Sequence, residues 1–124
     1  MIISTRALQV YAYRKPVDMR KGLDALYGLV LEELGRDPLT GDIFVFISRN
    51  RKRAKALLWD GTGLCLYSKR LERGRFAQLW GKGESYELKM TLTELQLLLE
   101  GSHAVGKYEL SPAIFDTRSV ALLR

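Results

Sequence analysis

Three short apolar segments between residues 43 and 71 constrain the fold of this chain more than any other feature. The first is the unbroken segment IFVFI at residues 43–47, and the other two cover residues 54–59 and 64–71. Turns at residues 48–53 and 60–63, rich in Arg, Asn, Asp and Gly, separate them. Short β-branched and aromatic segments divided in this way are typical of sequential antiparallel strands. The stretch therefore predicts two consecutive hairpins, which together form a β-meander.

Two further strands are expected outside the meander. Residues 8–13 form a mixed apolar segment that ends before Pro16, which cannot donate to a strand ladder. Tyr86, Leu88 and Met90 alternate with polar residues, as in a strand with one buried face. The sequence thus predicts an antiparallel meander of four or five strands.

The first of two expected helices begins at Asp18, a good N-cap, and ends at Gly35. Gly22 and Gly28 lie inside this helix, and close packing against the sheet is the simplest reason for them. Its apolar residues recur every three or four positions and line one face: Met19, Leu23, Leu26, Tyr27, Val30 and Leu34.

The second helix is expected from Thr91 to Gly101. Glu94 stands three residues after Thr91, and this spacing predicts a capping box. Two helices packed on a small antiparallel sheet place the chain in the α+β class. With 124 residues and 47% hydrophobic residues, we expect one domain over residues 1–124, with a core at about 8–101 and an extension at 102–124.

The composition also limits where the protein acts. No apolar run approaches the roughly 20 residues that a membrane span requires, and the N-terminus has no secretory signal pattern. We therefore expect a cytoplasmic protein without a membrane partner.

Positive charge is concentrated in the meander. Residues 49–75 carry nine cations against Asp60 and Glu72, a balance of 9 − 2 = +7, while the whole chain has 20 − 14 = +6. A basic surface confined to one substructure points to a polyanion such as double-stranded DNA. The candidate nucleic-acid-binding residues are Arg49, Arg51, Lys52, Arg53, Lys55, Lys69, Arg70, Arg73 and Arg75.

Eight of these nine cations, all except Lys55, fall into two groups. Those at residues 49–53 lie in a hairpin loop, where charge is often only solvated, and those at residues 69–75 continue a strand and could protect a sheet edge. Because the second group extends a strand, we expect it to be better ordered and to contribute more to DNA affinity per charge. Four aromatic residues could stack on bases, although core positions are commoner for them: Trp59, Tyr67, Phe76 and Trp80.

No catalytic, metal or cofactor site is expected. The lone histidine, His103, and the lone cysteine, Cys65, lack the spacing of zinc ligands, and phosphate-binding loops are missing from the sequence. Asp60 is expected to bond the amides of its own turn beside a buried Trp59. The other aspartates that a two-metal nuclease would need also have local explanations, as a helix cap, a helix residue and turn residues: Asp18, Asp24, Asp37 and Asp42.

The order of these motifs resembles a known family, the small TnpB-type accessory proteins of bacterial insertion sequences of family sixty-six, which are unrelated to the RNA-guided nuclease of the same name. The turn at residues 48–53 matches the family in character only, and residues from 102 onward extend past its usual end. The resemblance rests on VDMRKGLD at 17–24, DPLTG at 37–41, FVF at 44–46, LLWDGTGLCLY at 57–67, KRLERGRF at 69–76, LTEL at 92–95 and LLEG at 98–101.

The resemblance implies an accessory role in DNA transposition, beside a larger transposase and a second small accessory protein. It brings no catalytic residues. Two hypotheses follow: a non-catalytic protein that binds DNA through the basic meander, or an adaptor that binds the transposase or the second accessory protein. A single-stranded DNA or RNA binder is a more remote third.

Overall fold

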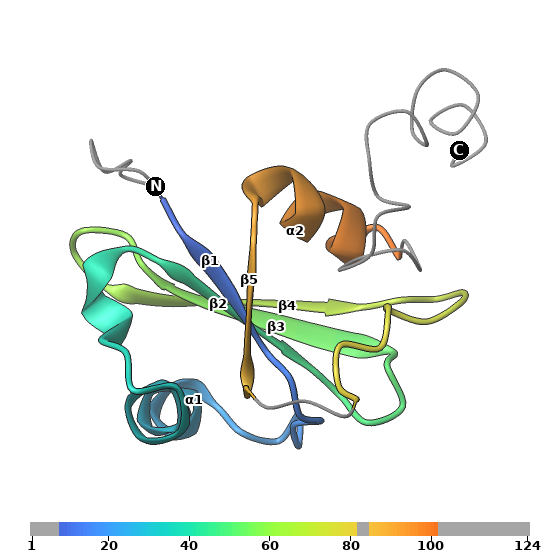
Figure 1. Cartoon of the computed structure of the whole chain (residues 1–124), viewed down its shortest axis with the longest axis horizontal. Coiled ribbons are helices and arrows are strands. Elements are labelled where there is room, and N and C mark those ends of the chain that lie inside the picture. The colour runs from blue at the N-terminus through green and yellow to red at the C-terminus, as the bar shows by residue number, and fades with distance from the viewer. Residues whose placement is uncertain (1–7, 82–84, 102–124) are drawn as a thin grey trace.

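A five-stranded sheet forms the centre of the protein in its computed structural model, which describes residues 8–81 and 85–101 (Figure 1). The strands lie side by side in the order β4-β3-β2-β1-β5. Their bounds are β1 (Val10–Tyr13), β2 (Ile43–Ile47), β3 (Arg53–Trp59), β4 (Leu64–Arg70) and β5 (Glu87–Met90). With two main helices, this sheet confirms the α+β class.

The central meander is confirmed, but the sheet is not antiparallel throughout. Strands β2, β3 and β4 pair antiparallel in sequence order, as the alternation and turns predict. Strand β1 lies between β2 and β5, and it runs parallel to β2 with Val10 beside Ile43. A parallel neighbour requires a crossover, and the helical segment between β1 and β2 provides it.

The first helix begins later than its apolar periodicity predicts. Helix α1 (Leu23–Leu29) has Gly22 at its N-cap, and it continues as the π-helical turn η1 (Val30–Leu34). Asp18 is therefore not the cap; its carboxylate accepts the backbone N–H of Arg20 at 2.9 Å and closes a separate turn. The end is as predicted, because Gly35 has a φ of 63° and terminates the helix in the left-handed conformation.

The second helix, α2 (Leu92–Leu99), begins with the predicted capping box. The Thr91 hydroxyl accepts the Glu94 N–H at 3.0 Å, and the Glu94 carboxylate accepts the Thr91 N–H at 2.9 Å. Both orphan donors of the first turn are thereby satisfied.

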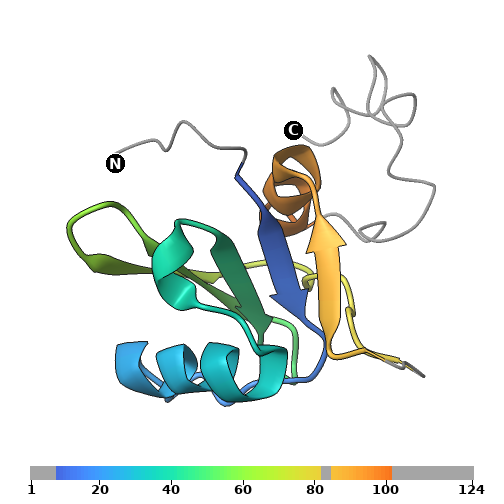
Figure 2. The same ribbon diagram turned by 60° about the vertical axis from the view of Figure 1, so that its left-hand side comes forward.

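The two helices cover opposite faces of the sheet and give three layers (Figures 1 and 2). On one face, Leu95 and Leu98 of α2 pack with Val45 and Phe76. On the other, Leu26 packs with further apolar residues of α1, β1, β2 and β3. The glycines of the first helix do not provide close packing on the sheet, because a Cβ at Gly22 or Gly28 would meet no atom within 4 Å.

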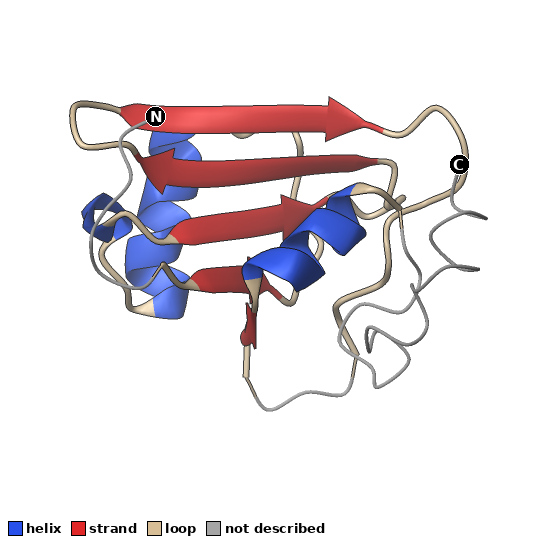
Figure 3. Cartoon of the chain, turned by 90° about the horizontal axis from the view of Figure 1, so that it is seen from above, coloured by secondary structure: helices blue, strands red, loops and turns tan. Residues whose placement is uncertain are grey.

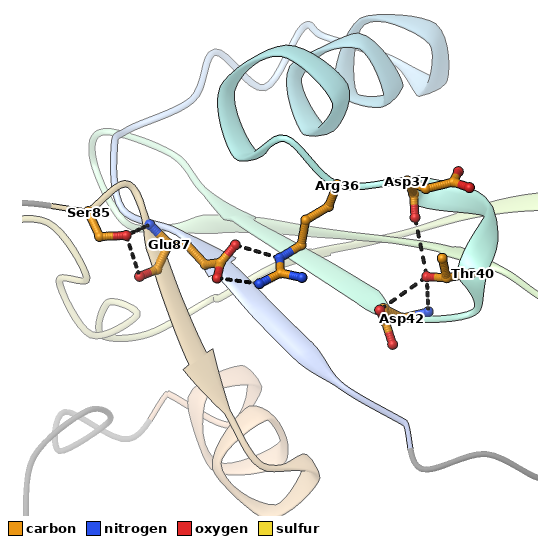
Figure 4. Close-up of polar contacts among 6 residues, drawn as sticks. All are labelled: Arg36, Asp37, Thr40, Asp42, Ser85 and Glu87. Atoms are coloured by element: carbon orange, nitrogen blue, oxygen red, sulfur yellow. Dashed lines mark hydrogen bonds and ion pairs between the residues drawn. The ribbon is translucent and has the colours of Figure 1, made fainter.

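An ion pair ties the end of the first helix to the edge strand β5. Arg36 donates from Nε and Nη2 to the two carboxylate oxygens of Glu87 at 2.6 and 2.8 Å (Figure 4). Its guanidinium also lies 3.8 Å from the ring centre of Tyr11 in β1. Because the pair is bidentate and stacked on a ring, it fixes the position of the helix relative to β1 and β5.

Candidate nucleic-acid interface

Hydrogen bonds bring two basic loops together at one end of the sheet. The first loop joins β2 to β3, and the second follows β4 (Figure 3). The N–H of Leu71 donates to the carbonyl of Lys52 at 2.8 Å, and the N–H of Phe76 donates to the carbonyl of Arg51 at 2.6 Å. The first bond continues the β3–β4 ladder by one residue pair, and the second holds residues 71–76 against residues 51–52.

Side chains within the first loop hold its shape. Asn50 accepts the Ser48 hydroxyl at 2.8 Å and the backbone N–H of Lys52 at 3.0 Å. The Ser48 hydroxyl in turn accepts the N–H of Arg53 at 3.1 Å. The sequence analysis singled out this loop by its cations and did not identify Ser48 and Asn50. Their Ser-x-Asn spacing is the signal that predicts such a side-chain-organised turn.

Seven of the nine candidate cations gather at this end, which we call the basic end. Arg53 in β3 lies directly opposite Arg70 in β4, although like charges in such positions are destabilising. With Glu72, the cluster has a balance of 7 − 1 = +6. Its cations are Arg49, Arg51, Lys52, Arg53, Arg70, Arg73 and Arg75.

Two of the seven are engaged within the protein. Arg51 donates to the carbonyl of Phe76 at 3.4 Å, and Arg70 pairs with Glu72 at 3.1 Å. The remaining side chains make no hydrogen bond or ion pair with any other residue in the described part of the chain: Arg49, Lys52, Arg53, Arg73 and Arg75.

The other two candidates, Lys55 and Lys69, lie away from the basic end. The Lys55 ammonium donates to the carbonyls of Met19 and Lys21, each at 2.8 Å, and thereby holds the loop before α1. On the opposite face, the Lys69 ammonium donates to the carbonyl of Leu99 at 2.7 Å. A cation at a helix C-terminus satisfies an orphan carbonyl and favours the helix dipole. Both lysines therefore have structural partners.

The expected difference in order between the two groups has no basis in the structure. Lys52 and Leu71 are hydrogen-bonded to each other, and Asn50 organises the loop that was expected to be the looser one. The entropic cost of fixing a cation should then be similar in both loops.

The aromatic residues differ widely in their exposure. Phe76 is fully buried, Trp59 and Trp80 are partly buried, and Tyr67 is 48% exposed. Trp59 is thus less buried than the sequence suggested. Tyr67 has the accessible ring that contact with another molecule requires.

The predicted Asp60 turn is confirmed at the other end of the β3–β4 hairpin. Its Oδ1 accepts the N–H groups of Thr62 and Gly63 at 2.9 Å each, and its Oδ2 accepts the Cys65 thiol at 3.4 Å. The hydrogen bond from the Thr62 amide is the main cause that lowers the pKa of Asp60 to about 2. The same carboxylate, followed by burial, raises the pKa of the Cys65 thiol, which disfavours a reactive thiolate.

The other aspartates serve the local backbone. Asp37 accepts the N–H of Leu39 at 2.9 Å and caps η2 (Pro38–Thr40). Asp42 accepts the Thr40 hydroxyl at 3.1 Å (Figure 4). Asp24 is exposed in the first turn of α1. Within residues 8–81 and 85–101, no three His, Cys, Asp or Glu residues could together hold a metal ion. His103 lies outside the described residues, as does the extension at 102–124.

The fold and its charged end define a small basic α+β domain, and sequence comparison gives the family. The model of the "IS66 Orf2 like protein" family matches residues 8–107. The chain belongs to this family of transposition accessory proteins. None of the described helices is long and apolar enough to cross a membrane.

Two relatives come from Sinorhizobium fredii. The uncharacterized protein y4jC is 38% identical over 101 residues, which cover 82% of this chain and 85% of the relative. The uncharacterized protein y4hO is 37% identical over 101 residues, which cover 82% of this chain and 86% of the relative. No solved structure matches the chain.

Proposed function

We propose that this protein is a non-catalytic accessory of transposition that binds double-stranded DNA through its basic end. The transposase and the second accessory protein of the same element act with it on that DNA. Such a role places it in the bacterial cytoplasm, where the DNA is.

One observation carries this proposal: seven cations are held together with a single carboxylate, Glu72, to balance them. Arg53 and Arg70 face each other across a strand pair, and the side chains of Arg53 and of four other cations of the basic end have no partner among the described residues. The fold gains nothing from this repulsion, whereas a row of phosphates relieves it. Contacts between cations and phosphates carry no sequence information, so we expect little sequence preference.

An adaptor that binds an acidic protein surface is the competing function, since the same cations suit it. The two differ in what they require: DNA binding needs no other protein, whereas an adaptor shows affinity only for its partner. The purified chain and a duplex of random sequence therefore separate them.

The test is fluorescence anisotropy of a labelled duplex over a range of salt concentrations. If the five unpartnered cations contact phosphates, log K should fall against log salt with a slope of about −4.5, which is ~0.9 per contact. Duplexes of different sequence should give similar affinities. No binding at low salt, with retained binding to the transposase, would establish the adaptor instead.

A further inference from the structure

Strand β4 leaves one edge of the sheet open. It is the last strand of the sheet on its side, and it has seven residues, whereas β5 at the other edge has four. In the described structure, no residue bonds to the outer backbone edge of β4. A long open edge is a template for strand addition unless proline, a bulge or charge blocks it.

The hydrogen bonds of the hairpin determine which backbone groups of β4 point away from β3. The backbone N–H of Asp60 donates to the carbonyl of Gly63, and the N–H of Leu71 donates to the carbonyl of Lys52. Both bonds continue the register of the β3–β4 pairs. Bonded pairs alternate along an antiparallel ladder, so residues 65, 67 and 69 bond to β3. The N–H and C=O groups that point away from the sheet belong to Leu64, Leu66, Ser68 and Arg70.

We propose that β4 pairs antiparallel with β4 of a second copy of this chain, centred on Tyr67. This register pairs all seven residues. It places Ser68 opposite Leu66 and Arg70 opposite Leu64 of the second copy, with both pairs hydrogen-bonded. The two sheets then form one continuous sheet across a two-fold axis.

The distribution of charge favours a second copy in this orientation. The cations of β4, Lys69 and Arg70, stand at its C-terminal end. Antiparallel pairing about Tyr67 places Lys69 opposite Cys65 of the second copy, so every cation meets an uncharged residue. A parallel pair of the same strands would instead bring the two basic ends together and repel.

The exposed ring of Tyr67 adds a second reason. Tyr67 is 48% exposed at the middle of the strand, where its ring has no stacking partner among the described residues. In the proposed dimer, the two Tyr67 residues occupy a non-hydrogen-bonded pair, in which cross-strand side chains lie closest. Aromatic pairs stabilise such positions, and rings of this kind are common at the centre of interfaces.

The dimer should be weak in free solution and stronger on DNA. A single strand pair buries less than the roughly 1,200–2,000 Å² of a stable interface. If the proposed DNA binding also holds, the two basic ends project in opposite directions from the paired strands, about 20 Å or more apart. A duplex that contacts both ends raises their effective concentration. The pairing itself does not depend on DNA.

Sedimentation velocity of the full chain from micromolar to millimolar concentration tests the pairing. Ser68→Pro removes an outward N–H and leaves the β3–β4 ladder intact, while Ser68→Ala is the matched control that keeps the N–H. We expect the wild type and Ser68→Ala to dimerise alike, and Ser68→Pro to raise the dimer Kd about tenfold or more. A wild type that stays monomeric at millimolar concentration, or a dimer unaffected by Ser68→Pro, would overturn the proposal.

Disulfide trapping decides the register even if Ser68→Pro fails to fold. In a Cys65→Ser background, Tyr67→Cys places two thiols at a pair with Cα atoms ~4.5 Å apart, which a disulfide can bridge. Thr62→Cys, in the exposed turn, is the control. We expect oxidation to give covalent dimers of the Tyr67→Cys variant only. If neither variant forms covalent dimers, or if both form equal amounts, the register is refuted.

The pairing and the proposed function can fail separately. Dimerisation without DNA binding would refute only the proposed function, and DNA binding by a strict monomer would refute only the pairing.

Discussion

The β3–β4 hairpin ends in two very different ways. At its turn, Asp60 accepts hydrogen bonds from two backbone amides and a thiol, so its charge is satisfied within five residues of chain. At its open end, Arg53 and Arg70 face each other across the ladder. The two ends therefore differ in whether the fold already provides a partner for each charge, and we expect this difference, rather than charge alone, to mark a surface that binds another molecule.

The same distinction divides the cations of the hairpin. Lys55 and Lys69 donate to carbonyls of segments that pack on the sheet. The side chains of Arg53 and Arg75 are exposed and make no hydrogen bond or ion pair in the part of the chain that the structure describes. If the distinction is functional, mutation of the unpartnered cations should lower DNA affinity, whereas mutation of Lys55 or Lys69 should lower stability.

The largest effect is expected from charge reversal at the basic end. Arg53→Glu with Arg75→Glu should weaken duplex binding about 100-fold at moderate salt, because two phosphate contacts become repulsive. The slope of log K against log salt should become shallower by about 1.8. Anisotropy over a salt series measures both.

Lys21→Glu with Lys89→Glu is the matched control, since it changes the net charge equally at two exposed residues elsewhere. Circular dichroism checks that both variants fold. Equal losses of affinity in the two variants would mean diffuse attraction and would remove the case for a localised interface.

A smaller effect is expected at the two structural lysines, and it should fall on stability rather than on DNA affinity. Lys55→Met keeps the apolar stem but removes two hydrogen bonds from a charged donor, and it should lower the free energy of unfolding by about 1–2 kcal/mol. Lys69→Met should cost a similar ~1 kcal/mol through its single bond to Leu99. Urea denaturation measures both changes. DNA affinity should stay near the wild-type value. A large loss of affinity at unchanged stability would instead show that these lysines contact DNA.

Local patterns predicted the parts of the fold that local contacts determine. Thr91 and Glu94 cap α2 as their spacing indicates, and Gly35 ends the first helix where its backbone freedom is needed. The meander follows from three apolar segments and two short turns. In each case the interacting residues lie close together in the chain.

Contacts between distant residues could not be predicted in this way. Lys55 has the same charge as Arg53. It differs because its ammonium donates to the carbonyls of Met19 and Lys21, which lie 36 and 34 residues away in the chain. The parallel position of β1 depends on the crossover through α1, which periodicity does not reveal. The sequence therefore predicted a candidate interface in the β3–β4 hairpin, but it could not separate the cations that have structural partners from the others.

The turn at the other end of the hairpin contains a carboxylate with a strongly shifted pKa, that of Asp60. The folded pKa of Asp60, about 2, lies below the ordinary value of 3.8. The carboxylate therefore contributes stability that is fully present above about pH 4 and is lost as the pH falls through about 2. Asp60→Asn should lower Tm by a few degrees at neutral pH, and the difference from the wild type should shrink below pH 4. Differential scanning calorimetry over this pH range measures it.

The neighbouring thiol supplies an independent measurement on the same variant. The Asp60 carboxylate raises the pKa of Cys65, so Asp60→Asn should lower that pKa and increase the rate at which Cys65 reacts with a disulfide reagent at mildly alkaline pH. Asp18→Asn is the control, because the pKa of Asp18 is also about 2 but its partner is Arg20 rather than a thiol. Equal reactivity in all three proteins would show that Asp60 does not act on Cys65. DNA affinity should be unchanged in both variants, since neither carboxylate belongs to the basic end.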